Sequence, residues 1–137
     1  MPKLKHIAIA ADDPDKTADF FMKVFDMKKL RTTDGSGHFG HILSDGNINL
    51  AALRFKTDAA AGEEFGAGYR GLHHIGFEVE DLPETVGKLT SNDGRRRSDI
   101  DAALGIESDS YKGEFKYSGP DGVMIDLSAN GWDETSG

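Results

Sequence analysis

The sequence predicts an α+β fold made of two tandem β-α-β-β-β modules. The first observation is an internal repeat: Lys5–Asp13 aligns without a gap on His73–Asp81, so that His6 matches His74. The second is that each copy is a strand-like stretch followed at once by a helix start. A repeat of roughly 65 residues with this pattern indicates two copies of one supersecondary unit in a single chain.

A second aligned pair closes each module. Asp45–Leu50 matches Asp121–Leu127 if the first copy has lost one residue after its glycine, and this alignment places Asn49 opposite Asp126. The chain of 137 residues is long enough to bury a core as one domain. We therefore expect a single domain, with a first module over about 3–56, a linker over about 57–70, a second module over about 71–130 and a polar tail over 131–137.

Composition excludes several classes of protein. The chain has no cysteine, which rules out disulfides, thiolate metal sites and a thiol nucleophile. Its formal net charge of −8 argues against partners such as nucleic acid or an anionic membrane. The only basic cluster, Arg95–Arg97, is expected to be a solvated loop or to contact an anionic substrate. No apolar run is long enough to cross a membrane and no signal peptide is visible, so a cytoplasmic location is expected.

The elements of the first module follow from apolar periodicity and turn residues. Leu4–Ala11 alternates, with Ile7 and Ile9 on the face that requires a covering helix. Asp12-Asp13-Pro14 starts that helix with an acidic N-cap and an early proline, and apolar residues then recur at helical spacing. The remaining strands are expected at Lys28–Asp34, His38–Ser44 and Ile48–Phe55, the first two joined by a glycine-containing hairpin turn.

The second module repeats this order around one poorly defined stretch. The strand that begins at Gly71 leads into a helix at Asp81, and the last two strands are expected at Glu114–Tyr117 and Val123–Ala129. The pattern from 95 to 112 is irregular, and its part from 98 to 104 fits either a short helical turn or a loop. The segment 57–70 is expected to be a linker or flexible loop, and the tail after residue 132 is expected to fray.

Four polar residues share the strand face that is turned away from the helices. Because side chains alternate along a strand, the large aliphatic side chains take one face, and the other face carries His6, Asn49, His74 and Asp126. If the two modules pair their sheets around a pseudo-twofold axis, these groups converge in one cleft. Two imidazoles, a carboxylate and a side-chain amide are suitable ligands for a divalent metal ion.

The repeat, together with the segments His74–Leu82 and Gly119–Leu127, resembles the vicinal oxygen chelate superfamily. That superfamily includes glyoxalase I, methylmalonyl-CoA epimerase, extradiol dioxygenases, and the fosfomycin and bleomycin resistance proteins. The resemblance implies an open-barrel sheet with helices outside, and a divalent ion (iron, manganese, nickel or zinc) held by His6, Asn49, His74 and Asp126. It also implies a small oxygenated substrate that chelates the metal, and a homodimer.

The ligand set departs from the patterns of individual members. Glyoxalase-type lyases are expected to have a carboxylate where this chain has Asn49, and epimerase-type members a longer amide. Without Asn49, the set is His6, His74 and Asp126, which suits iron(II) oxygenase chemistry. A dioxygenase-type site is therefore slightly favoured over a lyase or isomerase site. The alternative is a binding protein of the bleomycin-resistance type that sequesters a ligand without turnover.

Other residues of the strands are candidates for supporting roles. Glu78 lies on the cleft face and could act as a catalytic base, and Tyr117 is a candidate acid or base. His38 or His41 could line the cleft. His73 is expected to point to the face opposite the cleft and to be structural.

Overall fold

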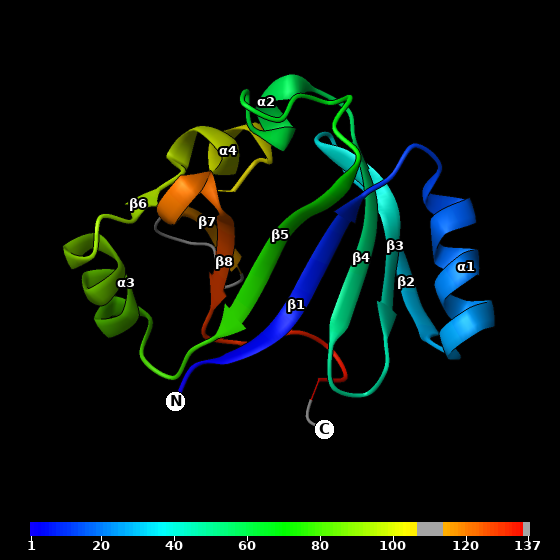
Figure 1. The fold of residues 1–137 in the computed structure, drawn as a ribbon, viewed down its shortest axis with the longest axis horizontal. Coiled ribbons are helices and arrows are strands. Elements are labelled where there is room, and N and C mark those ends of the chain that lie inside the picture. The colour runs from blue at the N-terminus through cyan, green and yellow to red at the C-terminus, as the bar shows by residue number, and fades with distance from the viewer. Residues whose placement is uncertain (107–113, 136–137) are drawn as a thin grey trace.

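The computed structural model describes residues 1–106 and 114–135. Eight strands form one mixed sheet in the order β2-β3-β4-β1-β5-β8-β7-β6, and helices lie at its two ends and over one edge (Figure 1). The first module comprises β1 (Lys3–Ala10), α1 (Pro14–Phe25), β2 (Lys28–Asp34), β3 (His38–Ser44) and β4 (Asn49–Phe55). The second comprises β5 (Gly71–Glu78), α3 (Leu82–Ser91), β6 (Arg95–Arg96), α4 (Ser98–Ala103), β7 (Glu114–Ser118) and β8 (Met124–Ser128). This α+β architecture confirms the predicted repeat.

The two long helices start in the same way. The Asp13 carboxylate accepts hydrogen bonds from the first backbone N–H groups of α1, and Asp81 does the same for α3. Each helix then covers the outer face of its own module. Ala18 of α1 packs with Leu43 and Leu50 in one hydrophobic cluster, and the partly buried apolar side of α3 packs on a second cluster. Helix capping and apolar spacing therefore act together, as the repeat predicted.

The modules join edge to edge within one chain. β1 pairs antiparallel with β5 at the centre of the sheet (Figure 1), while β4 and β8 pair parallel with them on either side. The four central strands are thus the first and last strands of the two modules. Their inner faces meet on the side of the sheet away from α1 and α3, which is where the polar residues lie.

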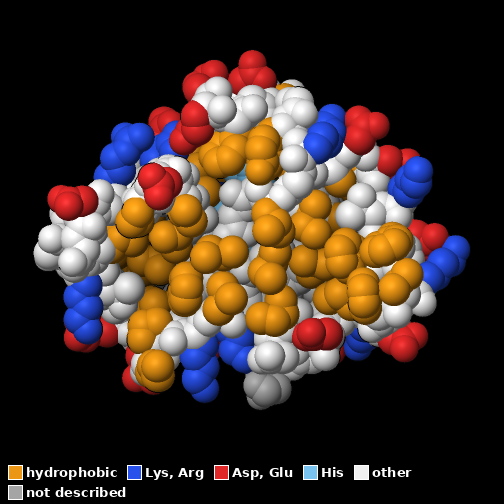
Figure 2. Space-filling view, in the orientation of Figure 1, with side chains coloured by type: hydrophobic (Ala, Val, Ile, Leu, Met, Phe, Trp, Pro, Cys, Tyr) orange, Lys and Arg blue, Asp and Glu red, His pale blue; other side chains and the backbone are white. Residues whose placement is uncertain are grey.

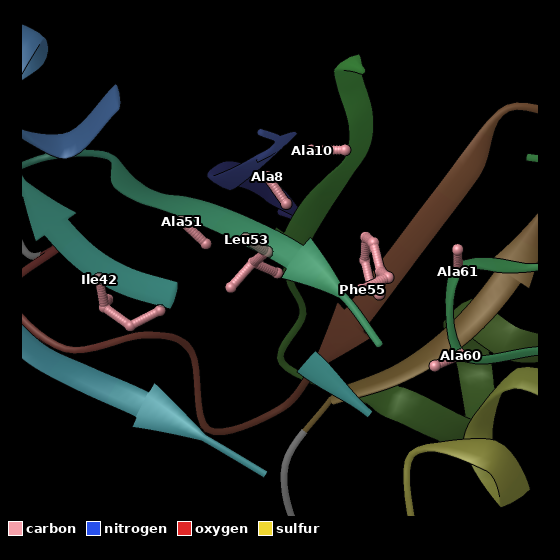
Figure 3. Close-up of a cluster of buried hydrophobic side chains, with 8 residues drawn as sticks. All are labelled: Ala8, Ala10, Ile42, Ala51, Leu53, Phe55, Ala60 and Ala61. Atoms are coloured by element: carbon pink, nitrogen blue, oxygen red, sulfur yellow. The ribbon is translucent and has the colours of Figure 1, made fainter. Parts of the chain in front are cut away.

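The segment between the modules is packed rather than flexible. It contains α2 (Asp58–Ala61), which Thr57 caps by accepting a hydrogen bond from the Ala60 backbone N–H. Ala60 and Ala61 are fully buried and belong to a cluster with small and apolar residues of β1, β3 and β4 (Figure 3). The linker therefore forms one wall of the domain core through these two alanines.

The stretch after α3 contains a two-residue strand and a helix, so the helical alternative for 98–104 is confirmed. The remainder of that stretch, from 107 onwards, lies outside the described residues until Glu114. Arg97 is not solvated as expected: it is buried, and its guanidinium pairs with Glu64 and Asp99 and donates to Ser118. This network ties the inter-module segment to α4 and β7. Arg96 pairs with the buried Asp101.

The tail also differs from expectation within the part that is described. Residues 129–135 pack back on the sheet, and Thr135 is buried. None of the helices in the described residues is long and apolar enough to cross a membrane. Figure 2 shows hydrophobic side chains gathered over the outer face of the sheet. Large exposed hydrophobic side chains of the chain include Leu4, Phe20, Val24, Phe25, Leu72 and Val123.

Candidate metal centre

Two β-bulges aim the candidate histidines. The β1–β5 ladder skips Lys5 on β1 and His73 on β5, and these two residues are equivalent in the repeat. A bulge interrupts the alternation of side chains, so Lys5 and His6 are both buried, as are His73 and His74. The expectation that His73 points away from His74 is therefore wrong: their Nδ1 atoms lie 2.8 Å apart.

The hydrogen bond between Asn49 and His6 occupies Nδ1 of His6, so Nε2 is the nitrogen that faces His74 and Asp126. The Asn49 Oδ1 atom lies 2.8 Å from His6 Nδ1. An amide oxygen only accepts hydrogen bonds, so His6 Nδ1 donates, and in the neutral ring Nε2 carries a lone pair. Asn49 thus orients His6 from behind; the structure does not place its oxygen with the other candidate ligand atoms.

A chain of two hydrogen bonds through His73 orients His74 in the same way. His73 Nε2 donates to the Ala61 carbonyl at 2.7 Å, so its Nδ1 must accept. The donor in the 2.8 Å contact is therefore His74 Nδ1–H, and His74 Nε2 carries the lone pair. Burial is the main cause that holds the pKa of His74 well below its usual value, followed by the charge of Lys116. His74 is thus a neutral imidazole that presents Nε2 to His6.

Four donor atoms converge at this point. One atom from each of His6, His74, Glu114 and Asp126 lies within 4.8 Å of all the others. The two Nε2 atoms are 3.2 Å apart, and Asp126 Oδ2 is 3.2 Å from His74 Nε2 and 3.9 Å from His6 Nε2. Two ligands about 2.1 Å from one ion, at roughly 90–110° to each other, lie about 3.0–3.4 Å apart.

These residues fit a divalent cation. Asp126 Oδ2 is buried and accepts no hydrogen bond from any residue that the structure describes. The Nε2 atoms of His6 and His74 face that oxygen, and a cation between the three atoms would satisfy the buried carboxylate. Two imidazoles and two carboxylates are ligand types found in zinc, iron, manganese and nickel sites.

A buried lysine balances the carboxylates. Lys116 Nζ lies 2.8 Å from Asp126 Oδ1, and both side chains are buried. Burial alone would lower the pKa of Lys116, but the charges of Asp126 and Glu114 outweigh it and raise the pKa above the usual value. For Asp126, burial alone would raise the pKa, but Lys116, a hydrogen bond with Glu114 and the charge of His6 together lower it. Burial, with a further contribution from Asp126, raises the pKa of Glu114.

A cavity of about 190 Å³ opens beside the donor atoms. Its polar lining comprises His6, Arg31, Thr33, His38, His74, Glu114 and Lys116, and its apolar lining comprises Ile42, Ala51, Leu53, Phe55 and Leu104. We call it the main cavity. A second cavity of about 160 Å³ shares Arg31 and Glu114 with it and is bounded by Trp132. The lining of the site therefore combines polar and apolar side chains.

Of the two strand histidines, His38 lines the main cavity and His41 does not. His38 Nδ1 is buried and has no hydrogen-bond partner among the described residues. Burial is the main cause that lowers the pKa of His38, with Lys116 adding to it. His41 pairs instead with Asp15 of α1 and with Thr32, on the helix side of the sheet.

The structure does not bring Glu78 and Tyr117 into the group of donor atoms. Tyr117 lies in the hydrophobic cluster that α3 covers, next to Phe115 and Leu127. Glu78 lies against Gly131 of the tail, where a side chain on residue 131 would collide with its carboxylate. Each role therefore stays a prediction without support from the geometry of the centre.

Sequence reasoning missed Glu114 and Lys116, although a signal for them exists. Lys116 pairs directly with Asp126 in the antiparallel β7–β8 hairpin, and Glu114 pairs with Ser128. Strand alternation starting from Asp126 would have placed both on the cleft face. The aromatic side chains that alternate with them, Phe115 and Tyr117, pack in the cluster that α3 covers.

The register also corrects the alignment of the last strands. His6 pairs with Asn49, and Ala8 pairs with Ala51. In the second module Gly76, the equivalent of Ala8, pairs with Asp126. The counterpart of Asp126 is therefore Ala51, so the first copy contains one residue more between turn and ligand position, not one fewer. This offset is why Asn49 reaches Nδ1 of His6.

Comparisons with known proteins agree with the fold. A family model described as the Glyoxalase/Bleomycin resistance protein/Dioxygenase superfamily matches residues 3–127. No curated protein matches the chain. A methylmalonyl-CoA epimerase from Streptomyces coelicolor, solved with 2-nitronate-propionyl-CoA, is 21% identical, with a TM-score of 0.69 over 93% of this chain and 97% of that chain.

Two further solved structures are similar. A hypothetical protein from Bacillus halodurans C-125 is 19% identical, with a TM-score of 0.67 over 92% of each chain. A methylmalonyl-CoA epimerase from Mycobacterium tuberculosis is 18% identical, with a TM-score of 0.63 over 90% of this chain and 85% of that chain. At these identities the structures establish a shared fold.

Proposed function

The chain belongs to the Glyoxalase/Bleomycin resistance protein/Dioxygenase superfamily, and we propose that it is a metal-dependent enzyme that moves a proton on a small, metal-chelating substrate. The observation that carries this proposal is the convergence of four donor atoms within 4.8 Å at the main cavity. His6, His74, Glu114 and Asp126 would hold the ion. When bound, a divalent ion there supplies Lewis-acid polarisation of substrate oxygens.

The donor set favours proton transfer over dioxygen chemistry. Iron(II) oxygenases use two histidines and one carboxylate and keep several positions open. Glu114 adds a second carboxylate to His6, His74 and Asp126 in this chain. A four-donor set leaves fewer open positions, enough for a chelating substrate but without one to spare for dioxygen. The slight preference for a dioxygenase rested on three ligands, and the added carboxylate reverses it in our proposal.

The main cavity supports a small substrate with one polar and one apolar end. Its volume of about 190 Å³ suits a small acid, or the acyl part of a larger ester whose remainder lies outside. Arg31 and Thr33 line its polar side and can bind a carboxylate or carbonyl, while Leu53 and Phe55 line the apolar side. Two of the similar structures are named methylmalonyl-CoA epimerase, and this supports a proton-moving reaction on an acyl substrate.

His38 is the best-placed group to accept the proton. It lines the same cavity as the donor atoms without belonging to them. Its lowered pKa keeps the imidazole neutral near pH 7, which a general base requires. No similar argument supports Tyr117, because its side chain packs in the core.

A second candidate function is ligand binding without metal. The Lys116–Asp126 pair at 2.8 Å already supplies one cation to the buried carboxylates. If that charge were sufficient, the cavity would act as a binding site for a small anion, as in the bleomycin-resistance type of protein. Metal binding separates the two functions.

The proposal is tested by metal titration of chelator-treated protein followed by a proton-exchange assay. We expect about one zinc or manganese ion per chain, lost in His6→Ala and His74→Ala. In D₂O, the loaded protein should exchange the C–H proton of small 1,3-dicarbonyl acids, as followed by NMR, and His38→Asn should slow exchange while retaining metal. His41→Asn, on the helix side of the sheet, is the control. Absence of saturable metal binding would leave only the binding-protein function.

A further inference from the structure

We infer that the C-terminal segment 129–135 is part of the metal centre, with Trp132 as a positioning residue that lies in a notch left by Gly76 and fixes His6 and Glu114. This inference rests on the metal binding proposed above, and it adds a segment that lies beyond the family-matched residues 3–127. It concerns how the donor atoms are held rather than which atoms they are.

Trp132 contacts two of the four proposed ligands. Its indole stacks on the His6 imidazole with a centroid separation of 4.9 Å and an interplanar angle of 2°. Its Nε1–H donates to Glu114 Oε2 at 3.3 Å. One ring thus restricts the rotation of His6 and orients the carboxylate of Glu114, which come from different modules.

Gly76 makes this arrangement possible. A Cβ atom on residue 76 would lie 2.7 Å from Trp132 Cη2 and 2.9 Å from His6 Cβ. Glycine weakens the interior of a strand, so its presence in β5 calls for a packing reason. The repeat-equivalent residue in β1 is Ala8. The first module therefore keeps a side chain where the second leaves room for the indole.

The segment is held at several points besides Trp132. Gly131 adopts a φ of +67° beside Glu78, a conformation and a clearance that suit glycine alone. The Ser44 hydroxyl donates to the Glu134 carbonyl, and Thr135 donates to the Trp132 carbonyl. Two ion pairs, Lys28–Glu134 and Arg31–Asp133, then attach the segment to β2.

These contacts make the segment a bridge between modules across the donor atoms. It leaves β8 in the second module and ends on β2 and β3 in the first (Figure 1). Its indole closes one side of His6 and Glu114 and bounds the second cavity. A centre that lacks it would have the same four donors with freer side chains, and so a lower affinity for metal.

The first arm of the test uses metal-free protein and does not depend on metal binding. Trp132 is the only tryptophan, so its emission and its quenching by acrylamide report this site alone. We expect shielded, blue-shifted emission in the native chain and exposed, red-shifted emission in Gly76→Ala. Gly68→Ala is the matched control, because a Cβ there meets nothing within 4 Å. An indole that is equally exposed in the native chain and in Gly76→Ala would overturn the placement.

The second arm measures zinc affinity by competition with a chelator. We expect Trp132→Ala and a chain ending at Asn130 to lose about 10–100-fold in affinity, and Trp132→Phe to lose less because it keeps the stacking. The combined Gly76→Ala/Trp132→Ala variant should lose less than the product of the two single losses. Circular dichroism confirms that each variant folds, and Trp132→Phe serves if Trp132→Ala does not.

The outcomes distinguish this inference from the proposed function. A shielded indole with no metal binding in the native chain would refute the metal-dependent function while the placement of Trp132 stands. Native zinc affinity in Trp132→Ala and in the shortened chain would refute the positioning role while leaving metal binding intact.

Discussion

Replacing Asp126 by Asn should destabilise the metal-free protein strongly, because it leaves Lys116 as a buried charge without its closest partner. Asp126 is fully buried and Lys116 is 4% exposed, with their charged atoms 2.8 Å apart. Removing one member of a buried ion pair typically costs about 3–5 kcal/mol. Glu114 remains near Lys116 and loses its repulsion with Asp126, so we expect the lower end of that range.

The assay is urea unfolding followed by far-ultraviolet circular dichroism, at pH 7.5 with a chelator present. A loss of about 3 kcal/mol moves the midpoint by about 1–3 M urea for a slope of about 1–3 kcal/mol/M. Asp34→Asn is the matched control, because the Asp34–Lys56 pair is exposed and such pairs contribute below about 1 kcal/mol. In the combined Lys116→Met/Asp126→Asn variant both charges are gone, and most of the lost stability should return.

An Asp126→Asn effect no larger than that of Asp34→Asn would refute this reasoning, since it would mean that the Lys116 charge is hydrated or neutral in the folded chain. A combined variant less stable than Asp126→Asn would refute it as well, because it would show that packing, rather than charge, accounts for the loss.

Three further predictions follow from the same contacts. His73→Phe removes the acceptor for His74 Nδ1–H, so zinc affinity should fall about 10–100-fold by chelator competition, while His41→Phe should leave it unchanged. Asn49→Ala removes the acceptor for His6 Nδ1–H and should cause a smaller loss than His6→Ala; an equal loss would show that Asn49 is itself a ligand. In the folded chain the pKa values of His38, His73 and His74 are lowered, so these histidines bind protons more readily in the unfolded chain. The free energy of unfolding of the metal-free protein should therefore fall as the pH drops below about 6.5, by up to about 1.4 kcal/mol per pH unit for each histidine. An unchanged urea midpoint from pH 7.5 to 5.5 would contradict this.

A homodimer of roughly twice the 14.8 kDa chain mass remains our proposal for the assembly. The outer face of the sheet offers a surface for it, because hydrophobic side chains gather there (Figure 2). Phe25 of α1, which packs on that face, is 60% exposed, so Phe25→Glu tests whether the contact includes α1. A monomer by light scattering at micromolar concentration would contradict the proposal.

The sequence was sufficient for the parts of the fold that depend on periodicity. The repeat, the Asp13 and Asp81 caps and the alternation in β1 and β8 predicted which elements form and placed His6, His74 and Asp126 on one face. Those features are local, so tertiary packing had only to preserve them.

The features that the sequence did not reveal depend on pairing between strands. Strand alternation predicts that His73 points away from the cleft, but a bulge turns its side chain to the other face. The sequence of one strand alone does not specify a bulge. The pairing register of β1 with β4 makes Ala51, rather than Asn49, the counterpart of Asp126. The contact of Trp132 with His6 joins residues that are far apart in the chain, through a notch that only the folded sheet creates.

The corrected register has a consequence for how a substrate lies in the main cavity. The two modules present the same four positions on facing walls. Gly40, Ile42, Ala51 and Leu53 of the first module stand where the second has Glu114, Lys116, Asp126 and Ser128. At these four positions the second module is charged or polar, and the first module has only glycine and hydrocarbon side chains. The duplicated halves are therefore chemically unlike at equivalent positions, so an asymmetric ligand would meet different side chains in the two orientations that the pseudo-twofold axis relates.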